Sequence, residues 1–318
     1  MLFTTSPGLN TIFLWLTLTL SFINADSPTN RCGKQFGYTC RGTAVYPCCS
    51  TMGYCGETPD HCAVGKCQPE FGTCWGGNTT PTTPPTSGGR SRPGNVPYGR
   101  DIYRCTGNRQ IALTFDDGPL EFTAELLDLL ANEGVKATFF ITGNSIGKGA
   151  IDSVQRWRNL IRRAYNEGHQ IAAHTWDHPR LNGLSEADRR WQMTRLETAF
   201  LDILGRYPTY MRPPFSDCNA ACRATMDYLG YHVIFWDVDT DDYNNNDPVR
   251  IENSRRKYFN AVEQYRSNYL VIAHDTQRET VRTLTKYMID AARARGYSLV
   301  RVGDCLGDPL ANWYRTTQ

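Results

Sequence analysis

The chain has 318 residues and carries a net charge of +2, with 34 basic and 32 acidic side chains. This length allows one full-sized domain together with smaller modules. The near balance of charge leaves no electrostatic footprint for nucleic acid or for an anionic membrane surface, so we expect neither as a partner.

Residues 1–25 have the features of a secretory signal peptide. The apolar run at residues 12–23 is too short to span a bilayer. Ala25 is a small residue of the kind that suits signal-peptidase cleavage, although no Lys or Arg precedes the run. No second apolar stretch occurs near the C-terminus. We therefore expect a secreted, extracellular protein, associated at most with a cell wall and without a membrane or lipid anchor.

Twelve cysteines in a secreted chain predict disulfide bonds rather than thiol chemistry. Eight of them lie between Cys32 and Cys74, and the others are Cys105, Cys218, Cys222 and Cys305. This uneven distribution separates a small module at residues 26–75 from a large domain at residues 99–310, with a C-terminal tail at residues 311–318. The module is too short and polar to build a core without disulfides. Zinc is the alternative, but the module contains no C-x-x-C pair.

Residues 76–98 are rich in Thr, Pro, Gly and Ser. Such a segment cannot bury apolar surface, which predicts a linker between the two domains. Asn78 begins the tripeptide Asn-Thr-Thr, an N-glycosylation sequon in a setting that suits a surface.

From residue 100 onward, short apolar segments alternate with longer amphipathic ones. Strands are expected at residues 111–115, 137–142, 169–174, 209–213, 231–236 and 269–274, and helices at residues 125–134, 153–168, 186–204, 220–230 and 280–296. This alternation predicts an α/β domain, a parallel sheet with helices outside, and the number of units favours a distorted (β/α) barrel. We expect Cys105 and Cys305 to close its two ends. Cys218 and Cys222 lie within disulfide reach if the segment is helical.

Polar residues follow the predicted strands where they end. The segments are Asp116-Asp117, His174 to His178, Arg212 to Phe215, Trp236 to Tyr243, and Ala273 to Asp275. The carboxyl ends of parallel strands share one face, so these side chains should meet there. The Asp-Asp-Gly-Pro sequence also suits an ordinary turn, and the two histidines could be surface residues.

The H-x-x-x-H spacing of His174 and His178 is nevertheless typical of metal ligands. One aspartate of the pair Asp116-Asp117 would complete a three-ligand site with an open position. The other aspartate, beside an activated water, would be placed to accept its proton.

Five segments together carry a resemblance: TFDDGP, HTWDH, RPPF, DVDTDDY and the strand end IAH. In this order they resemble the motifs of the polysaccharide deacetylase family, the NodB-homology carbohydrate esterases, over about residues 105–305. The resemblance implies a metal-dependent N-deacetylase on a distorted β/α barrel. It assigns metal binding to Asp117, His174 and His178, and the general base to Asp116.

The same resemblance implies roles for residues around this centre. Arg212 would orient Asp116, the backbone N–H of Phe215 would help to hold the oxyanion, and His274 would be the general acid, its pKa raised by Asp242. Residues expected to contact the substrate are Pro214, Phe215, Tyr243, Ile272 and Trp176. Ser216 stands where the family commonly has Gly, Tyr243 replaces a Trp, and Ile272 replaces a Leu, which bears on the acetyl pocket and the sugar subsites.

The cysteine spacing and the segment CCSTMGYCG of the small module resemble the hevein-type chitin-binding fold. The resemblance implies the disulfides Cys32–Cys49, Cys40–Cys55, Cys48–Cys62 and Cys67–Cys74, and sugar-binding positions at Ser50, Met52, Tyr54 and His61. Cysteine spacing alone leaves the pairing open. The alternative is a knottin with a structural role only.

These resemblances together imply hydrolysis of the N-acetyl groups of N-acetylglucosamine in chitin or chitooligosaccharides, giving chitosan and acetate, by a monomer. The expected cofactor is a divalent ion, with Zn²⁺ as the first choice and Co²⁺ as the alternative. Two His and one Asp suit zinc and would also accept cobalt, manganese or nickel. Rival functions are deacetylation of peptidoglycan or xylan, and a non-catalytic chitin lectin. A glycosidase is disfavoured, because adjacent aspartates cannot easily flank one bond at ~5–9 Å.

Overall fold

The structure is a computed structural model that describes residues 25–26, 31–36, 38–40, 48–63, 65–72, 74 and 90–317. The chain forms two compact units, residues 1–80 and residues 81–318, and each is considered by itself. The expected signal peptide up to residue 24, the sequon at Asn78 and the first part of the linker lie outside the described residues. Within the described part of the chain, no helix is long and apolar enough to cross a membrane.

The first unit is held together by disulfide bonds. Its short elements are β1 (Ala25–Asp26), β2 (Tyr38–Thr39), β3 (Cys48–Cys49), β4 (Cys55–Gly56) and α1 (Pro59–Cys62). The bonds are Cys32–Cys49, Cys40–Cys55, Cys48–Cys62 and Cys67–Cys74, the pairing implied by the hevein-type resemblance. Its buried core consists of cysteines and Phe71. The disulfides thus replace the apolar core that this short segment cannot form.

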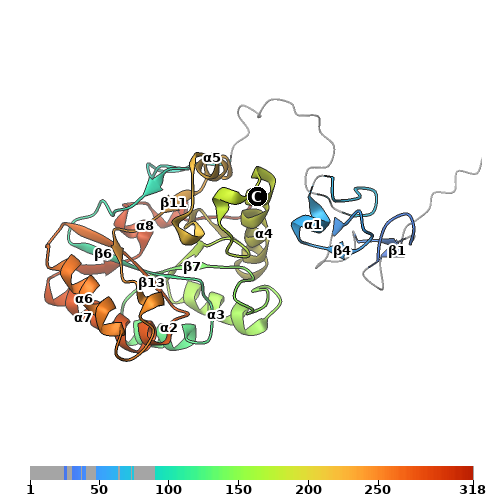
Figure 1. The fold of residues 1–318 in the computed structure, drawn as a ribbon. Coiled ribbons are helices and arrows are strands. Elements are labelled where there is room, and N and C mark those ends of the chain that lie inside the picture. Colours follow the sequence, from blue (N-terminus) through green and yellow to red (C-terminus); the bar gives the residue numbers. More distant parts are fainter. Residues whose placement is uncertain are drawn as a thin grey trace, which may run out of the picture. The chain divides into compact units, whose positions relative to one another are not determined.

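The second unit is built on a parallel sheet. Its strands are β5 (Asp101–Ile102), β6 (Gln110–Asp116), β7 (Thr138–Ile141), β8 (Gln170–Ala173), β10 (Tyr210–Met211), β11 (His232–Ile234), β12 (Val238–Asp239), β13 (Asn268–His274) and β14 (Ser298–Val300). Their order is β12-β13-β6-β7-β8-β10-β11-β5, with β14 beside β6. All of these pairs are parallel. β12 and β5 stand at the two ends of this order. The sheet curls into a half-barrel (Figure 1), which confirms the expected distorted barrel.

Helices cover the outside of the sheet. They are α2 (Thr123–Asn132), α3 (Gln155–Asn166), α4 (Glu186–Leu204), α5 (Ala220–Leu229), α6 (Ile251–Val262), α7 (Thr285–Ala294), which a π-helical turn (Thr280–Leu284) precedes, and α8 (Val302–Cys305). Helices α6 and α7 lie side by side, as do α4 and α5 (Figure 1). Local signals set the ends of α4: the Ser185 side chain accepts a hydrogen bond from the Asp188 backbone, and Gly205 adopts a left-handed conformation.

The remaining elements are short. They are four 3₁₀ turns (Leu181–Gly183, Pro214–Ser216, Asp242–Asn244 and Leu310–Asn312) and the antiparallel pair β9 (Tyr207–Pro208) and β15 (Tyr314–Arg315). Two disulfides, Cys105–Cys305 and Cys218–Cys222, connect the segments expected from the sequence. The first joins the beginning of the domain to its end, next to the apolar core around Ile234 and Leu270.

Both flanks of the domain pack against it. Arg90 donates two hydrogen bonds, of 2.5 and 2.8 Å, to the buried carboxylate of Glu197 on α4. Val96 joins the apolar core, and the Tyr98 ring lies 3.9 Å from that of His232. Trp313, in the segment expected to be a tail, is buried. Residues 90–98, assigned to the linker from composition, therefore contribute contacts to this unit. Composition did not reveal these contacts, because they depend on single side chains.

Candidate active site

Four strands of the half-barrel bring the expected site residues to one edge of the sheet. Asp116 is the last residue of β6 and His274 the last residue of β13, and the two are register partners. His174 directly follows β8, and Arg212 directly follows β10. Because neighbouring strands are parallel, all four side chains emerge at the same end of the sheet. Asp116, His174 and His274 line a cavity of about 450 Å³, and Arg212 lies buried behind Asp116.

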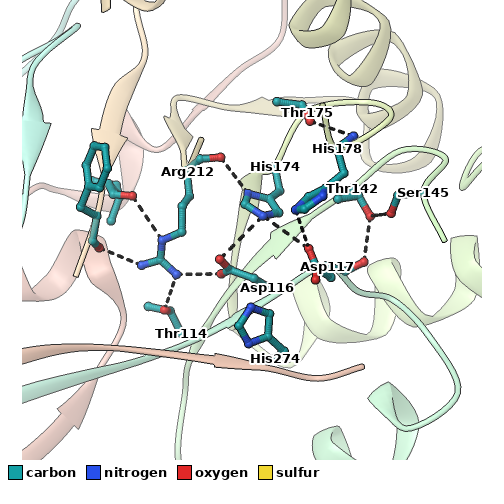
Figure 2. A network of polar contacts seen from close by, with 12 residues as sticks. Thr114, Asp116, Asp117, Thr142, Ser145, His174, Thr175, His178, Arg212 and His274 are labelled. Atoms are coloured by element: carbon teal, nitrogen blue, oxygen red, sulfur yellow. Dashed lines mark hydrogen bonds and ion pairs between the residues drawn. The ribbon is translucent and has the colours of Figure 1, made fainter. Parts of the chain in front are cut away.

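The candidate metal ligands Asp117, His174 and His178 lie together at this cavity (Figure 2). Oδ1 of Asp117 is 3.4 Å from Nε2 of His174 and 3.2 Å from Nε2 of His178. This oxygen is buried and has no hydrogen-bond partner. Although burial favours the neutral form, the two histidines hold the pKa of Asp117 well below its usual range.

The second nitrogen of His174 fixes its tautomer. Nδ1 lies 2.7 Å from the carbonyl oxygen of Arg212, which only accepts, so Nδ1 is the donor of this hydrogen bond. Nε2 is therefore the ring nitrogen that faces Asp117, and it is the nitrogen that would bind a metal ion, as in other metal-binding histidines. Two imidazole nitrogens and one carboxylate oxygen suit a divalent transition metal, and the unpaired buried oxygen of Asp117 fits such an ion.

Asp116 and Arg212 form a fully buried ion pair beside this ligand set. Nη1 of Arg212 donates to Oδ1 of Asp116 at 2.7 Å and to the Thr114 hydroxyl at 2.6 Å. Its other nitrogens donate to the carbonyl oxygens of Ile234 and Phe235. The guanidinium is thus held rigidly, and Oδ2 of Asp116, which is 3.8 Å from Nε2 of His174, is the oxygen left on the side of the ligands.

His274 pairs with the buried Asp242. Nδ1 of His274 lies 2.7 Å from Oδ1 of Asp242, and the His274 backbone N–H and the Thr280 hydroxyl both donate to Oδ2. Burial of His274 opposes its charged form, but the carboxylate of Asp242 outweighs it and raises the pKa of His274 to about 10. The ring is thereby kept protonated at neutral pH at the wall of the cavity.

Left-handed backbone conformations concentrate at the site. Asp117, Thr175, His178, Phe215 and Ser216 all have φ between 56° and 76°. Such conformations cost free energy in residues other than glycine and are typical of functional sites. For Asp117 the consequence is direct, because consecutive strand residues point to opposite faces. The turn at Asp117 lets its carboxylate reach the same cavity as Asp116.

The expected substrate residues are only partly placed as predicted. Phe215, Tyr243 and Ile272 line the cavity. Pro214 is buried and its neighbour Pro213 lines the cavity instead. Trp176 does not line the cavity: its side chain is 1% exposed, and the guanidinium of Arg195 lies 3.7 Å from the centre of its ring. Thr175, the residue before it, has a left-handed backbone conformation, which the sequence does not reveal.

Other residues that line the cavity are Arg180, Trp236 and Asp239, which were not among the predicted site residues, and Ser216, which the sequence marked only as a replacement of Gly. The Arg180 guanidinium lies 4.5 Å from the centre of the Phe215 ring, whose other neighbour is the His178 ring at 4.6 Å. Arg180, Trp236 and Asp239 all lie in or next to the motif segments, so proximity in sequence was the available signal.

In the small module, the four positions expected to bind sugar differ in exposure. Met52 and Tyr54 are 74% and 46% exposed, whereas Ser50 is buried, with its hydroxyl accepting a hydrogen bond from the Tyr54 backbone. Nδ1 of His61 is 2.8 Å from the Thr58 hydroxyl. The guanidinium of Arg31 lies 3.9 Å from the centre of the Tyr54 ring, so one face of that ring is covered.

Comparison with known proteins identifies the larger unit. The family model described as polysaccharide deacetylase matches residues 103–234. Chitin deacetylases of Colletotrichum lindemuthianum and of Pestalotiopsis sp. are 41% and 43% identical to the chain, over 69% and 71% of its length and 88% and 74% of theirs. The solved structure of the chitin deacetylase from C. lindemuthianum matches with 42% identity and a TM-score of 0.68, over 70% of this chain and 98% of that one. The chain therefore belongs to the polysaccharide deacetylase family, whose fold and ordered motifs it carries.

Proposed function

We propose that the chain is a secreted, metal-dependent chitin deacetylase that hydrolyses the N-acetyl groups of N-acetylglucosamine units and releases acetate. The observation that carries this proposal is the arrangement within one cavity of a ligand set, a base and an acid. The ligand set is Asp117, His174 and His178, with Asp116 and His274 on adjacent strands beside it. The similarity to two chitin deacetylases supports the choice of substrate.

The ligand set would hold a divalent ion, and Zn²⁺ is the ion that this donor set suits best. When bound, such an ion supplies Lewis acidity, which polarises the acetyl carbonyl and makes water a nucleophile at neutral pH.

Asp116 would act as the general base. Its Oδ1 is tied to Arg212 at 2.7 Å, which orients the carboxylate and leaves Oδ2 facing the ligand set. This oxygen would accept the proton of the water molecule that attacks the acetyl carbon. Because Arg212 is itself fixed by Thr114 and two backbone carbonyls, the base is preorganised rather than free to rotate.

His274 would act as the general acid. Hydrolysis of an amide requires protonation of the departing amine, which is a poor leaving group otherwise. Nδ1 of His274 is engaged with Asp242, so Nε2 carries the proton available to the cavity. Its raised pKa, about 10, keeps Nε2 protonated until the C–N bond breaks and the departing amine accepts the proton. After release, the amine retains the proton and the carboxylate product is acetate.

Phe215 and its neighbours would hold the acetylated sugar. We expect the backbone N–H of Phe215 to help stabilise the oxyanion, usually the largest catalytic contribution in acyl transfer. The exposed rings of Phe215, which contacts His178, and of Tyr243, which contacts His274, would provide stacking surfaces for sugar units next to the reacting one.

The disulfide-rich module would bind chitin weakly and tether the enzyme to it. Exposed Tyr54 is the aromatic platform, with Met52 beside it in sequence. Arg31 covers one face of the Tyr54 ring, so a sugar would stack on the other. One ring face supplies about 0.5–1.5 kcal/mol, which is too little for tight binding by itself.

A substrate panel tests this proposal. Purified full-length protein with one equivalent of Zn²⁺ would be given N-acetylglucosamine oligomers, acetylxylan and peptidoglycan in turn, and released acetate would be measured. We expect acetate and free amine in equal amounts from the oligomers, and at least tenfold slower release from the other two polymers. Asp116→Asn is the matched inactive control.

Preferential release of acetate from peptidoglycan or acetylxylan would overturn the choice of chitin while leaving deacetylation intact. Release of shortened oligomers without acetate would instead indicate a glycosidase and overturn the proposal as a whole.

A further inference from the structure

Lys148 is a buried lysine next to the candidate metal site. Its side chain is 9% exposed and lies in the segment between two left-handed glycines, Gly147 and Gly149. Nζ donates to the carbonyl oxygens of Asp117 and Gly118, at 3.0 and 2.9 Å, and to the Thr142 hydroxyl at 2.7 Å. Two of the three hydrogen bonds of the Lys148 side chain therefore go to the turn that carries Asp117, and the third goes to Thr142, which contacts the same turn.

Thr142 completes the hold on the same turn. Its hydroxyl donates to the Asp117 carbonyl at 2.8 Å, and its backbone N–H donates to the Gly118 carbonyl at 3.2 Å. The Ser145 hydroxyl donates in turn to that of Thr142 at 2.8 Å (Figure 2). Two successive carbonyls thus each accept two hydrogen bonds, which fixes both peptide planes that follow the Asp117 side chain.

The position of Lys148 is fixed from its own side. The indole N–H of Trp157 donates to the Lys148 carbonyl at 2.8 Å, and the Lys148 backbone N–H donates to the Ser145 carbonyl at 3.2 Å. Burial lowers the pKa of Lys148 to about 7, and the fully buried carboxylate of Asp275, whose Oδ2 accepts a hydrogen bond from the Thr123 hydroxyl, acts against that shift. The lysine is therefore an anchored donor in the interior, with a buried counter-charge.

We propose that Lys148 is a positioning residue for the metal site: it holds Asp117 in its left-handed conformation, and so aims the carboxylate at His174 and His178. Asp117 has φ of 76°, a conformation that an unsupported aspartate rarely adopts. Without the ammonium, each of the two carbonyls keeps only its contact with Thr142. The turn then relaxes, and the Asp117 oxygen leaves its place 3.2 to 3.4 Å from the two imidazole nitrogens.

An effect of Lys148 through its charge and an effect through the positioning of Asp117 predict opposite changes in metal affinity, so an experiment can separate them. If Lys148 acted only through its charge, removing that charge would strengthen the binding of a divalent cation nearby. If it acts by positioning Asp117, removing it weakens metal binding. Loss of a residue that orients a metal ligand typically costs about 10–100-fold in metal affinity.

The experiment measures Zn²⁺ affinity of the full chain by competition with a chromogenic chelator, and ligand geometry from the visible absorption spectrum of the Co²⁺-loaded protein. The test variants are Lys148→Met, which keeps the length of the stem, and Lys148→Met/Asp275→Asn, which also removes the counter-charge in case the single variant does not fold. Asp275→Asn alone reports the effect of losing the buried carboxylate, and the surface change Lys286→Met is the control.

We expect both Lys148 variants to bind Zn²⁺ about 10–100-fold more weakly than the wild type, with an altered Co²⁺ spectrum. The Lys286→Met control should bind as the wild type does. Thr142→Val should weaken binding to a smaller extent, and Thr142→Ser, which retains the hydroxyl, should restore it.

Equal or tighter Zn²⁺ binding by a folded Lys148 variant, with an unchanged Co²⁺ spectrum, would overturn the inference. The inference rests on the proposed metal dependence, and the wild type separates the two: a wild-type protein that binds no metal overturns the proposed function, whereas a wild type that binds it and a variant that binds it equally overturn only the role of Lys148.

Discussion

Asp116 and His274 are register partners at the carboxyl ends of two adjacent parallel strands, β6 and β13. Partners in register point to the same face of a sheet, so the proposed base and acid are set side by side by the backbone itself. The same alternation brings Thr114 and Ile272, two residues earlier, to that face. The proposed division of labour between Asp116 and Asp117 follows, because only Asp116 obeys the strand alternation and Asp117 departs from it by a left-handed turn.

This division predicts different defects for the two aspartates. Asp117→Ala removes an oxygen of the ligand set and should abolish stoichiometric metal binding. Asp116→Asn should retain the metal and lose about 10²–10⁴ in rate, the usual contribution of a general base. Metal content of the purified variants and their rates of acetate release provide the comparison. A metal-free Asp116→Asn protein would show that the assignment of ligand and base is incorrect.

The pair His274–Asp242 predicts a shift in the pH–rate profile. Activity requires protonated His274, so the basic limb of the profile follows the pKa of His274, which Asp242 raises. Asp242→Asn removes that carboxylate and should move the basic limb to lower pH. A divalent ion in the same cavity also lowers this pKa, so the direction of the shift between metal-loaded proteins is the quantity to compare. An unmoved limb would assign the acid to another group.

The same pair has a consequence for stability, whose sign follows from the raised pKa. His274 titrates near 6.5 in the unfolded chain and about 10 in the folded one. Its contribution to the free energy of unfolding is therefore fully present below pH 6.5 and disappears as the pH rises toward 10. Asp242→Asn should accordingly destabilise the metal-free protein more at pH 6 than at pH 10, as measured by urea unfolding.

Two other histidines should make the free energy of unfolding depend on pH in the opposite direction, with stability lost in acid. Burial lowers the pKa of both His169 and His232 from 6.5 to about 4. Nδ1 of His169 accepts a hydrogen bond from the Ala137 backbone, which protonation would break. Because the unfolded chain takes up these protons first, stability present above pH 6.5 should fall as the pH drops toward 4, by about 1.4 kcal/mol per pH unit for each histidine.

The variant His169→Asn/His232→Asn isolates this effect, because asparagine places an amide atom close to the Nδ1 position without a titrating group. Its free energy of unfolding should fall less steeply than that of the wild type between pH 6.5 and 4.5. Parallel slopes for the two proteins would mean that these histidines do not contribute to acid sensitivity.

Two truncations distinguish the residues that only connect the small module to the catalytic unit from those that stabilise the catalytic unit. Deleting residues 26–89 should leave turnover of soluble oligomers unchanged and reduce activity on colloidal chitin, because a tethered module raises the local substrate concentration. Deleting residues 26–98 also removes Arg90, whose guanidinium pairs with the buried Glu197 carboxylate, and leaves that carboxylate the hydrogen bond from the Tyr231 hydroxyl. An unpaired buried charge costs about 3–5 kcal/mol.

The melting temperatures of the two truncated proteins test this boundary. The longer deletion should melt well below the shorter one, with Arg90→Ala in the full chain reproducing most of the difference. Loss of activity on soluble oligomers by the shorter deletion would instead make the module a part of the catalytic groove.

Periodicity and motif order were sufficient to predict the central strands and the residues at their ends. The apolar runs at residues 111–115 and 269–274 coincide with β6 and β13, and the resemblance placed Asp116, His174, Arg212 and His274 in one site. Helix α6 was missed, because residues 251–262 are largely polar and no side chain caps its first turn. A helix of this kind is stabilised by its packing against other elements, and the sequence alone does not show that packing.

The features that escaped prediction depend on backbone conformation or on single side chains. No pattern signals that Asp117 and Thr175 adopt left-handed conformations, yet the first brings a ligand into the cavity and the second sends Trp176 into the interior. Lys148 lies between two glycines in a segment without periodicity, and only the fold shows its ammonium beneath the Asp117 turn. Local strain and long-range polar contacts are tertiary properties.

The central claim is that Asp117, His174 and His178 hold the ion on which acetate release depends. The most direct measurement is acetate release from N-acetylglucosamine oligomers by the purified chain after chelation, and again after addition of one equivalent of Zn²⁺, with His174→Ala treated in parallel. The account predicts no release after chelation, recovery in the wild type on adding Zn²⁺, and no recovery in His174→Ala. Undiminished acetate release by the fully metal-depleted wild type would contradict it.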